Sequence, residues 1–101
     1  FMGLVDTKEV EAFATTLAED LGRRFPPASE KRTDTGAVNQ LKVILEGLEN
    51  RAARFRDEKR LGLYKKAKLG TVFRWKLKDL GYSDAFVDRA TNAIVTRVAM
   101  K

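Results

Sequence analysis

The feature that most constrains the fold is the spacing of apolar residues, which recur every three or four positions in four separate segments. In the longest segment the spacing places Leu41, Leu45, Leu48, Ala52 and Phe55 in one series. This period puts apolar side chains on one face of an α-helix, whereas a half-buried strand needs strict alternation. We find no convincing strand pattern, and the sequence therefore predicts an all-α fold.

Four amphipathic helices are expected to pack as one compact bundle. A chain of 101 residues has the length of a single domain, here residues 1–101. Phe1 before Met2 has the look of a cloning remnant, although a trimmed natural chain would begin in the same way. The predicted helices cover about residues 7–24, 36–59, 63–80 and 84–100.

Capping residues mark the expected ends of these helices. Asp6 is placed to cap the first helix, with Glu9 reaching back in a capping box, and two consecutive prolines end it. A break near Leu61 and Gly62 is expected after the second helix, although the second and third helices could run on together. Gly81-Tyr82-Ser83 would form a tight turn between the third and fourth helices. The remaining expected caps are Asp34 or Thr35, Gly81 and Ser83.

The apolar series of the second helix forms a heptad-like seam, which Val38 extends backwards. The seam covers only about two heptads, which is short for a coiled coil, so packing inside the domain is the default interpretation. A homodimer through the seam is the alternative. Gly47 interrupts this helix and predicts either a bend or a close crossing with another helix.

Positive charge is concentrated in the middle of the chain. Residues 51–78 carry eleven Lys and Arg side chains against Asp57 and Glu58, a net charge of +9. Residues 1–30 carry three basic and six acidic side chains, a net charge of −3. A clustered basic region is typical of proteins that bind a polyanion.

The outer face of the third helix combines this charge with aromatic rings. Stepping by about 100° per residue from Phe73 places Tyr64, Trp75 and two lysines opposite the core stripe. On one interpretation the rings stack on unpaired bases. On the other they pack against the first helix, as aromatic residues at helical spacing usually do, and leave the lysines in solvent.

The leading functional hypothesis is a small nucleic-acid-binding protein or accessory subunit that contacts the phosphates of DNA or RNA with low sequence selectivity. Tyr64 and Trp75 are its candidate stacking groups. The candidate phosphate contacts are Arg51, Arg56, Lys59, Arg60, Lys65, Lys66, Lys68, Arg74 and Lys78.

Two other binding modes are weaker or compete with this hypothesis. A helix-turn-helix would place the start of the fourth helix on bases, but Asp84 and Asp88 there would repel phosphates. The competing hypothesis is a protein–protein interaction module, or a homodimer, that uses the seam or the Tyr64 and Trp75 face. The turn Leu80-Gly81-Tyr82-Ser83 resembles that of ubiquitin-associated domains over four residues, and no function is carried over from it.

The composition disfavours catalysis, metal binding and a membrane partner. Cysteine and histidine are both absent, which removes disulfides, thiolate and imidazole ligands and the usual acid–base groups. No nucleotide-binding glycine motif is present, so we expect no cofactor, no metal and no enzymatic activity. No apolar run approaches the roughly 20 residues of a membrane span, and we expect a cytoplasmic protein.

Overall fold

The computed structural model describes residues 6–100, and over this range the fold is all-α without a strand. The elements are α1 (Lys8–Arg24), the short 3-10 helix η1 (Pro27–Lys31), α2 (Thr35–Lys59), α3 (Leu63–Leu80) and α4 (Asp84–Ala99). The predicted fold class is confirmed, and each predicted helix end lies within one residue of its observed position. Phe1 lies outside the described residues.

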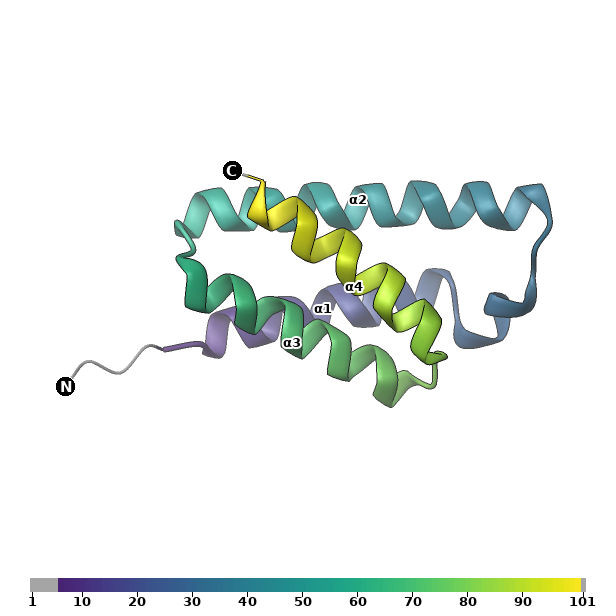
Figure 1. Cartoon of the computed structure of the whole chain (residues 1–101), viewed down its shortest axis with the longest axis horizontal. Coiled ribbons are helices and arrows are strands. Elements are labelled where there is room, and N and C mark those ends of the chain that lie inside the picture. Colours follow the sequence, from purple (N-terminus) through teal and green to yellow (C-terminus); the bar gives the residue numbers. More distant parts are fainter. Residues whose placement is uncertain (1–5, 101) are drawn as a thin grey trace.

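The four α-helices alternate in direction along the long axis of an elongated molecule of 51 × 25 × 19 Å (Figure 1). α3 packs between α1 and α4, and α4 packs between α3 and α2. α1 and α2 contact each other much less, although they follow one another in the chain. The ends of α2 and α4 therefore meet the starts of α1 and α3 at one end of the molecule.

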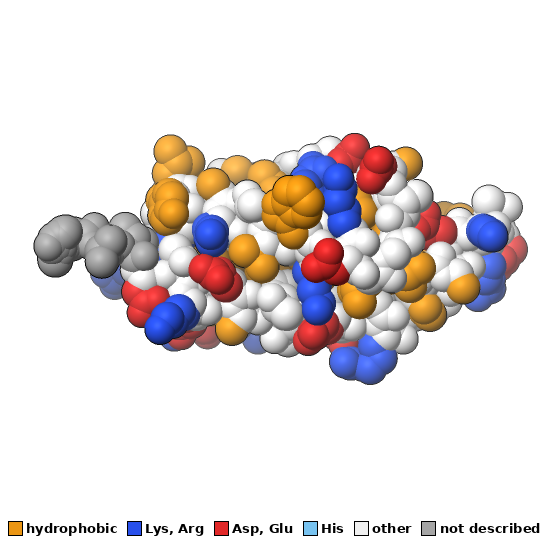
Figure 2. Space-filling view, turned by 90° about the horizontal axis from the view of Figure 1, so that it is seen from below, with side chains coloured by type: hydrophobic (Ala, Val, Ile, Leu, Met, Phe, Trp, Pro, Cys, Tyr) orange, Lys and Arg blue, Asp and Glu red, His pale blue; other side chains and the backbone are white. Residues whose placement is uncertain are grey.

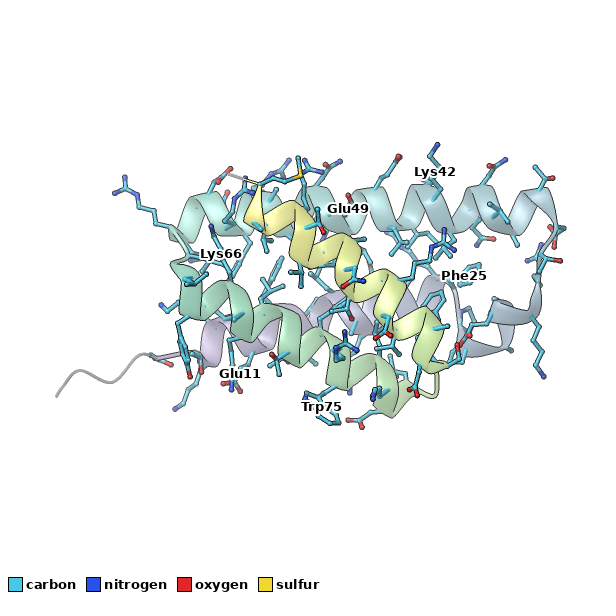
Figure 3. All side chains as sticks on the ribbon, viewed as in Figure 1. Glu11, Phe25, Lys42, Glu49, Lys66 and Trp75 are labelled. Atoms are coloured by element: carbon cyan, nitrogen blue, oxygen red, sulfur yellow. The ribbon has the colours of Figure 1, made fainter. Side chains whose placement is uncertain are left out.

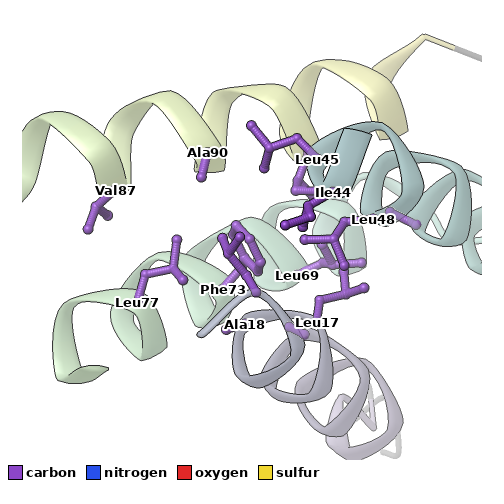
Figure 4. Close-up of a cluster of buried hydrophobic side chains, with 14 of the residues drawn as sticks. Leu17, Ala18, Ile44, Leu45, Leu48, Leu69, Phe73, Leu77, Val87 and Ala90 are labelled. Carbon is purple, nitrogen blue, oxygen red and sulfur yellow. The ribbon is translucent and has the colours of Figure 1, made fainter. Parts of the chain in front are cut away.

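The core lies where the apolar stripes of all four helices meet, with Phe73 near its centre (Figure 4). The predicted seam of α2 is part of it: Leu41, Leu45, Leu48 and Ala52 are buried inside the chain. The seam therefore has its partners within the domain, as the default interpretation held. Val38 departs from the prediction because it is 49% exposed.

Three of the expected caps are present. The Asp34 side chain accepts a hydrogen bond from the backbone N–H of Ala37 at 3.0 Å, and Ser83 Oγ accepts one from the N–H of Phe86 at 3.3 Å. Gly81 ends α3 with a φ of 104°, a left-handed conformation that glycine adopts without steric cost. These caps fix the starts of α2 and α4 and the end of α3.

The predicted capping box at the start of α1 is wrong. Thr7 occupies the N-cap position without a side-chain cap bond, and its hydroxyl donates to Glu11 Oε2 at 2.6 Å. Asp6 accepts from the N–H of Lys8 at 3.0 Å, and Glu9 forms an ion pair with Lys59. Glu9 has turned to a cation on α2 that is distant in sequence, which a local motif does not reveal.

A sharp corner separates α2 from α3, so the two helices do not run on together. Arg60 has the left-handed φ of 51° that closes α2, and the N–H of Leu61 bonds to the carbonyl of Arg56 at 3.0 Å. Gly62 is the extended N-cap of α3. The break thus lies where the sequence predicts it, but an arginine takes the strained position in place of the glycine.

Glycine permits a close helix crossing at Gly70 and not at Gly47. A Cβ added to Gly70 would lie 2.7 Å from Val95 Cγ2, which shows that α3 and α4 approach there without room for a side chain. A Cβ on Gly47 would meet nothing within 4 Å, and α2 is one continuous helix through this residue. The crossing predicted at Gly47 is therefore wrong.

The loop predicted over residues 26–36 contains η1, which ties the end of α1 to the start of α4. Both carboxylate oxygens of Glu30 accept hydrogen bonds from Ser83, one from its N–H at 2.7 Å and one from its hydroxyl at 2.6 Å. Nearby, the Tyr82 hydroxyl donates to the carbonyls of Phe25 and Leu21. Burial, followed by the charge of Glu30, raises the pKa of Tyr82 to about 12.

Candidate functional site

The outer face of α3 leaves both aromatic candidates in solvent. Tyr64 is 61% exposed and Trp75 is 59% exposed, so the interpretation that they pack against α1 is wrong. Figure 3 shows Trp75 projecting from the side of α3 that faces away from α2. The ammonium group of Lys78 lies 5.5 Å from the centroid of the Trp75 ring, a cation–π arrangement.

Much of the positive charge of the middle segment is neutralised by α1. The acidic side chains of α1 reach across to lysines of α2 and α3 along its length. The hydrogen bond from Glu9, followed by its charge, raises the pKa of Lys59. The pairs are Lys59 with Glu9 at 2.9 Å, Lys76 with Glu19 at 3.5 Å and Lys68 with Glu11 at 3.9 Å.

Arg51 is part of a structural ion cluster around a buried carboxylate. Asp20 on α1 is only 4% exposed, and its Oδ2 accepts a hydrogen bond from Arg51 Nη1 at 2.8 Å. Arg23 and Arg24 also pair with this carboxylate. Arg51 therefore joins α2 to α1 where direct packing between these helices is sparse.

Arg56 serves mainly as a cap for α4. Its Nη1 donates to the carbonyl of Arg97 at 2.8 Å, and its Nε and Nη2 donate to Asp57 at 2.9 and 3.2 Å. The side chain is only 11% exposed. The hydrogen bond to Asp57 raises the pKa of Arg56.

Arg74 and Lys78 lie at the opposite end of α3 and pair with the start of α4. Arg74 bonds to Asp88, and Lys78 lies 3.8 Å from Asp84. Both carboxylates belong to the helix that the helix-turn-helix interpretation would place on DNA. Figure 2, which views the molecule from below, shows basic and acidic side chains interleaved on that face instead of a patch of one sign.

The clearest gathering of cations that lack such partners is a basic hollow at the corner between α2 and α3. It measures about 540 Å³ and is lined by Arg56, Asp57, Arg60, Leu61 and Lys66. Within residues 6–100, Arg60 and Lys66 form no ion pair, and Figure 3 shows Lys66 directed from α3 towards the end of α2. We call these five residues the basic hollow.

Lys65 and Tyr64 occupy the first turn of α3 beside this hollow but point elsewhere. Successive helical residues are turned by about 100°, so Lys65 and Lys66 cannot share one face. In the described range Lys65 forms no ion pair and is partly exposed. Of the eleven candidate residues, the structure brings Arg56, Arg60 and Lys66 together and distributes the others over the rest of the surface.

An apolar groove adjoins the hollow, and sequence reasoning missed it. The groove lies between the start of α3 and the end of α4, and Lys66 lines both features. Leu63 at its edge is 86% exposed. Its residues continue the apolar stripes of two helices, so their pattern is that of a core and gives no sign of exposure. The groove is lined by Leu63, Lys66, Ala67, Val95, Val98 and Ala99.

The described side chains offer binding chemistry more readily than catalytic chemistry. No group of three or more Asp and Glu residues in the described range is arranged to hold a metal ion. The pKa of Tyr82 is raised, which is the opposite of an activated nucleophile. None of the helices within residues 6–100 is long and apolar enough to span a bilayer. Comparisons with protein-family models, curated proteins and solved structures gave no match to the chain.

Proposed function

We propose that this protein binds nucleic acid through the phosphate backbone at the basic hollow, with little sequence selectivity and without catalysis. The observation that carries the proposal is the pair of side chains, Arg60 and Lys66, that share the hollow and have no ion-pair partner within residues 6–100. Cations that are free of intramolecular partners neutralise phosphates at the smallest energetic cost. A cytoplasmic location belongs to the same proposal.

The backbone conformation of Arg60 supports this role. A left-handed residue with a side chain is strained by about 1–2 kcal/mol, and Gly62 two positions later would avoid that strain if it closed the helix. Strained residues concentrate at functional sites, where the side chain has a use that outweighs the strain. The conformation directs the Arg60 side chain to the wall of the hollow.

The exposed rings of Tyr64 and Trp75 favour a single-stranded partner. The two residues are eleven positions apart, which is roughly 16 Å along an α-helix. Rings on a basic surface can stack on unpaired bases but find no free base face on a duplex. We therefore expect single-stranded oligonucleotides to bind more tightly than duplexes of the same length.

Fluorescence-anisotropy titrations with labelled single- and double-stranded DNA and RNA, each at several salt concentrations, test the proposal. We expect binding that weakens steeply with salt and that quenches the emission of Trp75, the only tryptophan of the chain. Trp75→Ala should weaken single-stranded binding more than duplex binding. Absence of binding to every probe at low salt would rule the proposal out.

A protein interaction module is the second candidate, and the apolar groove is the observation in its favour. Exposed apolar side chains that adjoin one another often mark a protein interface. Leu63 and Val95 are the natural anchors because both are exposed and line the groove. Light scattering tests the homodimer form: a dimer that Leu63→Asp dissociates would favour this candidate, and a monomer at all concentrations would exclude that form.

A further inference from the structure

A second pocket lies at the opposite end of the molecule, where α2 and α4 begin. It measures about 310 Å³, near the lower limit of about 300 Å³ for small-molecule sites. Its walls come from four stretches of chain that meet there: the end of α1, η1 with the following loop, and the first turns of α2 and α4. The lining residues are Phe25, Glu30, Arg32, Thr33, Ala37, Val38, Leu41, Ser83, Ala85, Phe86 and Arg89.

The floor of this pocket is apolar and aromatic. Phe25 and Phe86 stack with their ring centroids 6.0 Å apart, and Ala37 and Leu41 close the side towards α2. All four side chains are buried, so the floor is a fixed part of the fold. Figure 3 shows Phe25 in the space between α2 and the start of α4. An apolar ligand body would replace water above this floor.

The rim of the pocket offers one cation that is not otherwise engaged. The guanidinium of Arg32 bonds to Asp34 through two nitrogens at 3.2 and 3.1 Å, and this contact lowers the pKa of Asp34. Both oxygens of Glu30 are occupied by Ser83. Arg89, by contrast, is exposed and has no ion pair within residues 6–100.

We propose that this pocket binds a small amphiphilic monocarboxylate, with its apolar body on Phe25 and Phe86 and its carboxylate on Arg89. The N–H groups that start α2 and α4 are already capped by Asp34 and Ser83, so the carboxylate depends on the arginine. A guanidinium holds a carboxylate through two parallel hydrogen bonds. The volume limits the ligand to a short acyl chain or a single aromatic ring.

Titration of the whole protein with octanoate and with octan-1-ol, followed by backbone amide NMR shifts, tests this site. We expect octanoate to shift the amides of pocket residues at low millimolar concentration and to bind more tightly than the uncharged alcohol. Arg89→Gln should weaken octanoate about tenfold, the loss expected for one charge-assisted contact, and leave octan-1-ol unchanged. Ala85→Phe should fill the pocket and abolish both interactions.

Lys66→Gln, in the basic hollow at the other end of the molecule, is the matched control and should leave octanoate binding unchanged. Shifts spread over the whole surface, or an octanoate affinity that Arg89→Gln does not alter, would overturn the proposed site. The same holds if octanoate produces no shifts at the pocket. The site is independent of the nucleic-acid proposal, because neither Arg89→Gln nor Ala85→Phe changes the basic hollow.

Discussion

Single side chains tie the helices of this protein together as much as the apolar core does. Tyr82 is the clearest case: its ring packs on Phe86 with centroids 4.4 Å apart, and its hydroxyl reaches backbone carbonyls at the end of α1. Asp20 plays the corresponding part for charge, because it collects three arginines around one buried carboxylate. Each of these residues makes contacts that its sequence neighbourhood does not announce.

Tyr82→Phe should lower the free energy of unfolding by about 1 kcal/mol at neutral pH, because it removes a buried hydrogen bond. The wild type should also lose stability at high pH, since the folded phenol has its pKa raised to about 12 whereas an unfolded tyrosine titrates near 10. The contribution is complete below pH 10 and is lost as the pH rises towards 12, on the order of 2 kcal/mol. Urea unfolding of both proteins over this range provides the measurement. An equal alkaline loss in Tyr82→Phe would contradict the assignment.

Arg51→Ala should destabilise the fold by about 1 kcal/mol, because Asp20 loses one of its cations. Arg54→Ala is the matched control: Arg54 is exposed on the same helix, and its loss should change stability by less than about 0.5 kcal/mol. Thermal unfolding distinguishes the two. If Arg51→Ala left stability unchanged but weakened oligonucleotide binding, the structural role assigned to Arg51 would be wrong.

The elements themselves follow from local rules, and the departures occur where two elements meet. Apolar spacing and capping residues place all four helices, since both signals act within a few residues. Local rules could not find the crossing of α3 over α4 at Gly70, because the requirement comes from Val95, which is distant in sequence. They also misplaced the N-cap of α1, where Glu9 is drawn to Lys59.

Gly70→Ala and Gly47→Ala form a matched pair that tests the crossing. Alanine improves helix propensity by about 1 kcal/mol at an unobstructed helical position, so Gly47→Ala should stabilise the protein by roughly that amount. At Gly70 the new methyl group meets the stiff Val95 side chain, and overpacking should produce a net loss of about 1 kcal/mol. Chemical denaturation measures both effects, and Val95→Ala should rescue Gly70→Ala. Equal stabilisation by both alanines would contradict the close crossing.

The corner between α2 and α3 should show a conflict between stability and binding. Arg60→Gly relieves the strain of a left-handed arginine and should stabilise the fold by about 1 kcal/mol. It should weaken oligonucleotide binding at the same time, because it removes a cation from the basic hollow. Thermal unfolding and anisotropy of one protein sample give both values. A variant that gained stability and kept its affinity would remove Arg60 from the proposed site.

At the scale of the whole molecule, charge is arranged by the packing of helices and not by the order of the sequence. The chain has a net charge of +6, and its basic middle and acidic start have opposite signs. The fold brings them together, so that Glu9, Glu11 and Glu19 of α1 pair with three of the lysines. The cations left over are the ones that can act on a partner, and Arg60 and Lys66 among them share a hollow.

This arrangement explains how much of the candidate site could be predicted. The sequence locates the basic segment and the outer face of α3, because both depend on residue type and helical period. It does not separate Arg51 or Lys68, which are engaged by α1, from Arg60 or Lys66, which are free of such partners in the described range. That distinction depends on which helices become neighbours, and in this fold α1 lies beside α3.

The salt dependence of oligonucleotide binding by the double variant Arg60→Asn, Lys66→Gln tests the central proposal most directly. Asparagine tolerates the left-handed backbone of residue 60, so the fold should be preserved. The control is Lys31→Gln, Lys42→Gln, which removes two exposed cations near the opposite end of the molecule. We predict that the first variant reduces the slope of log affinity against log salt by about 2 for a duplex, since each lost phosphate contact accounts for about 0.9, and that the control retains the wild-type slope. Equal slopes for the two variants would contradict binding at the basic hollow.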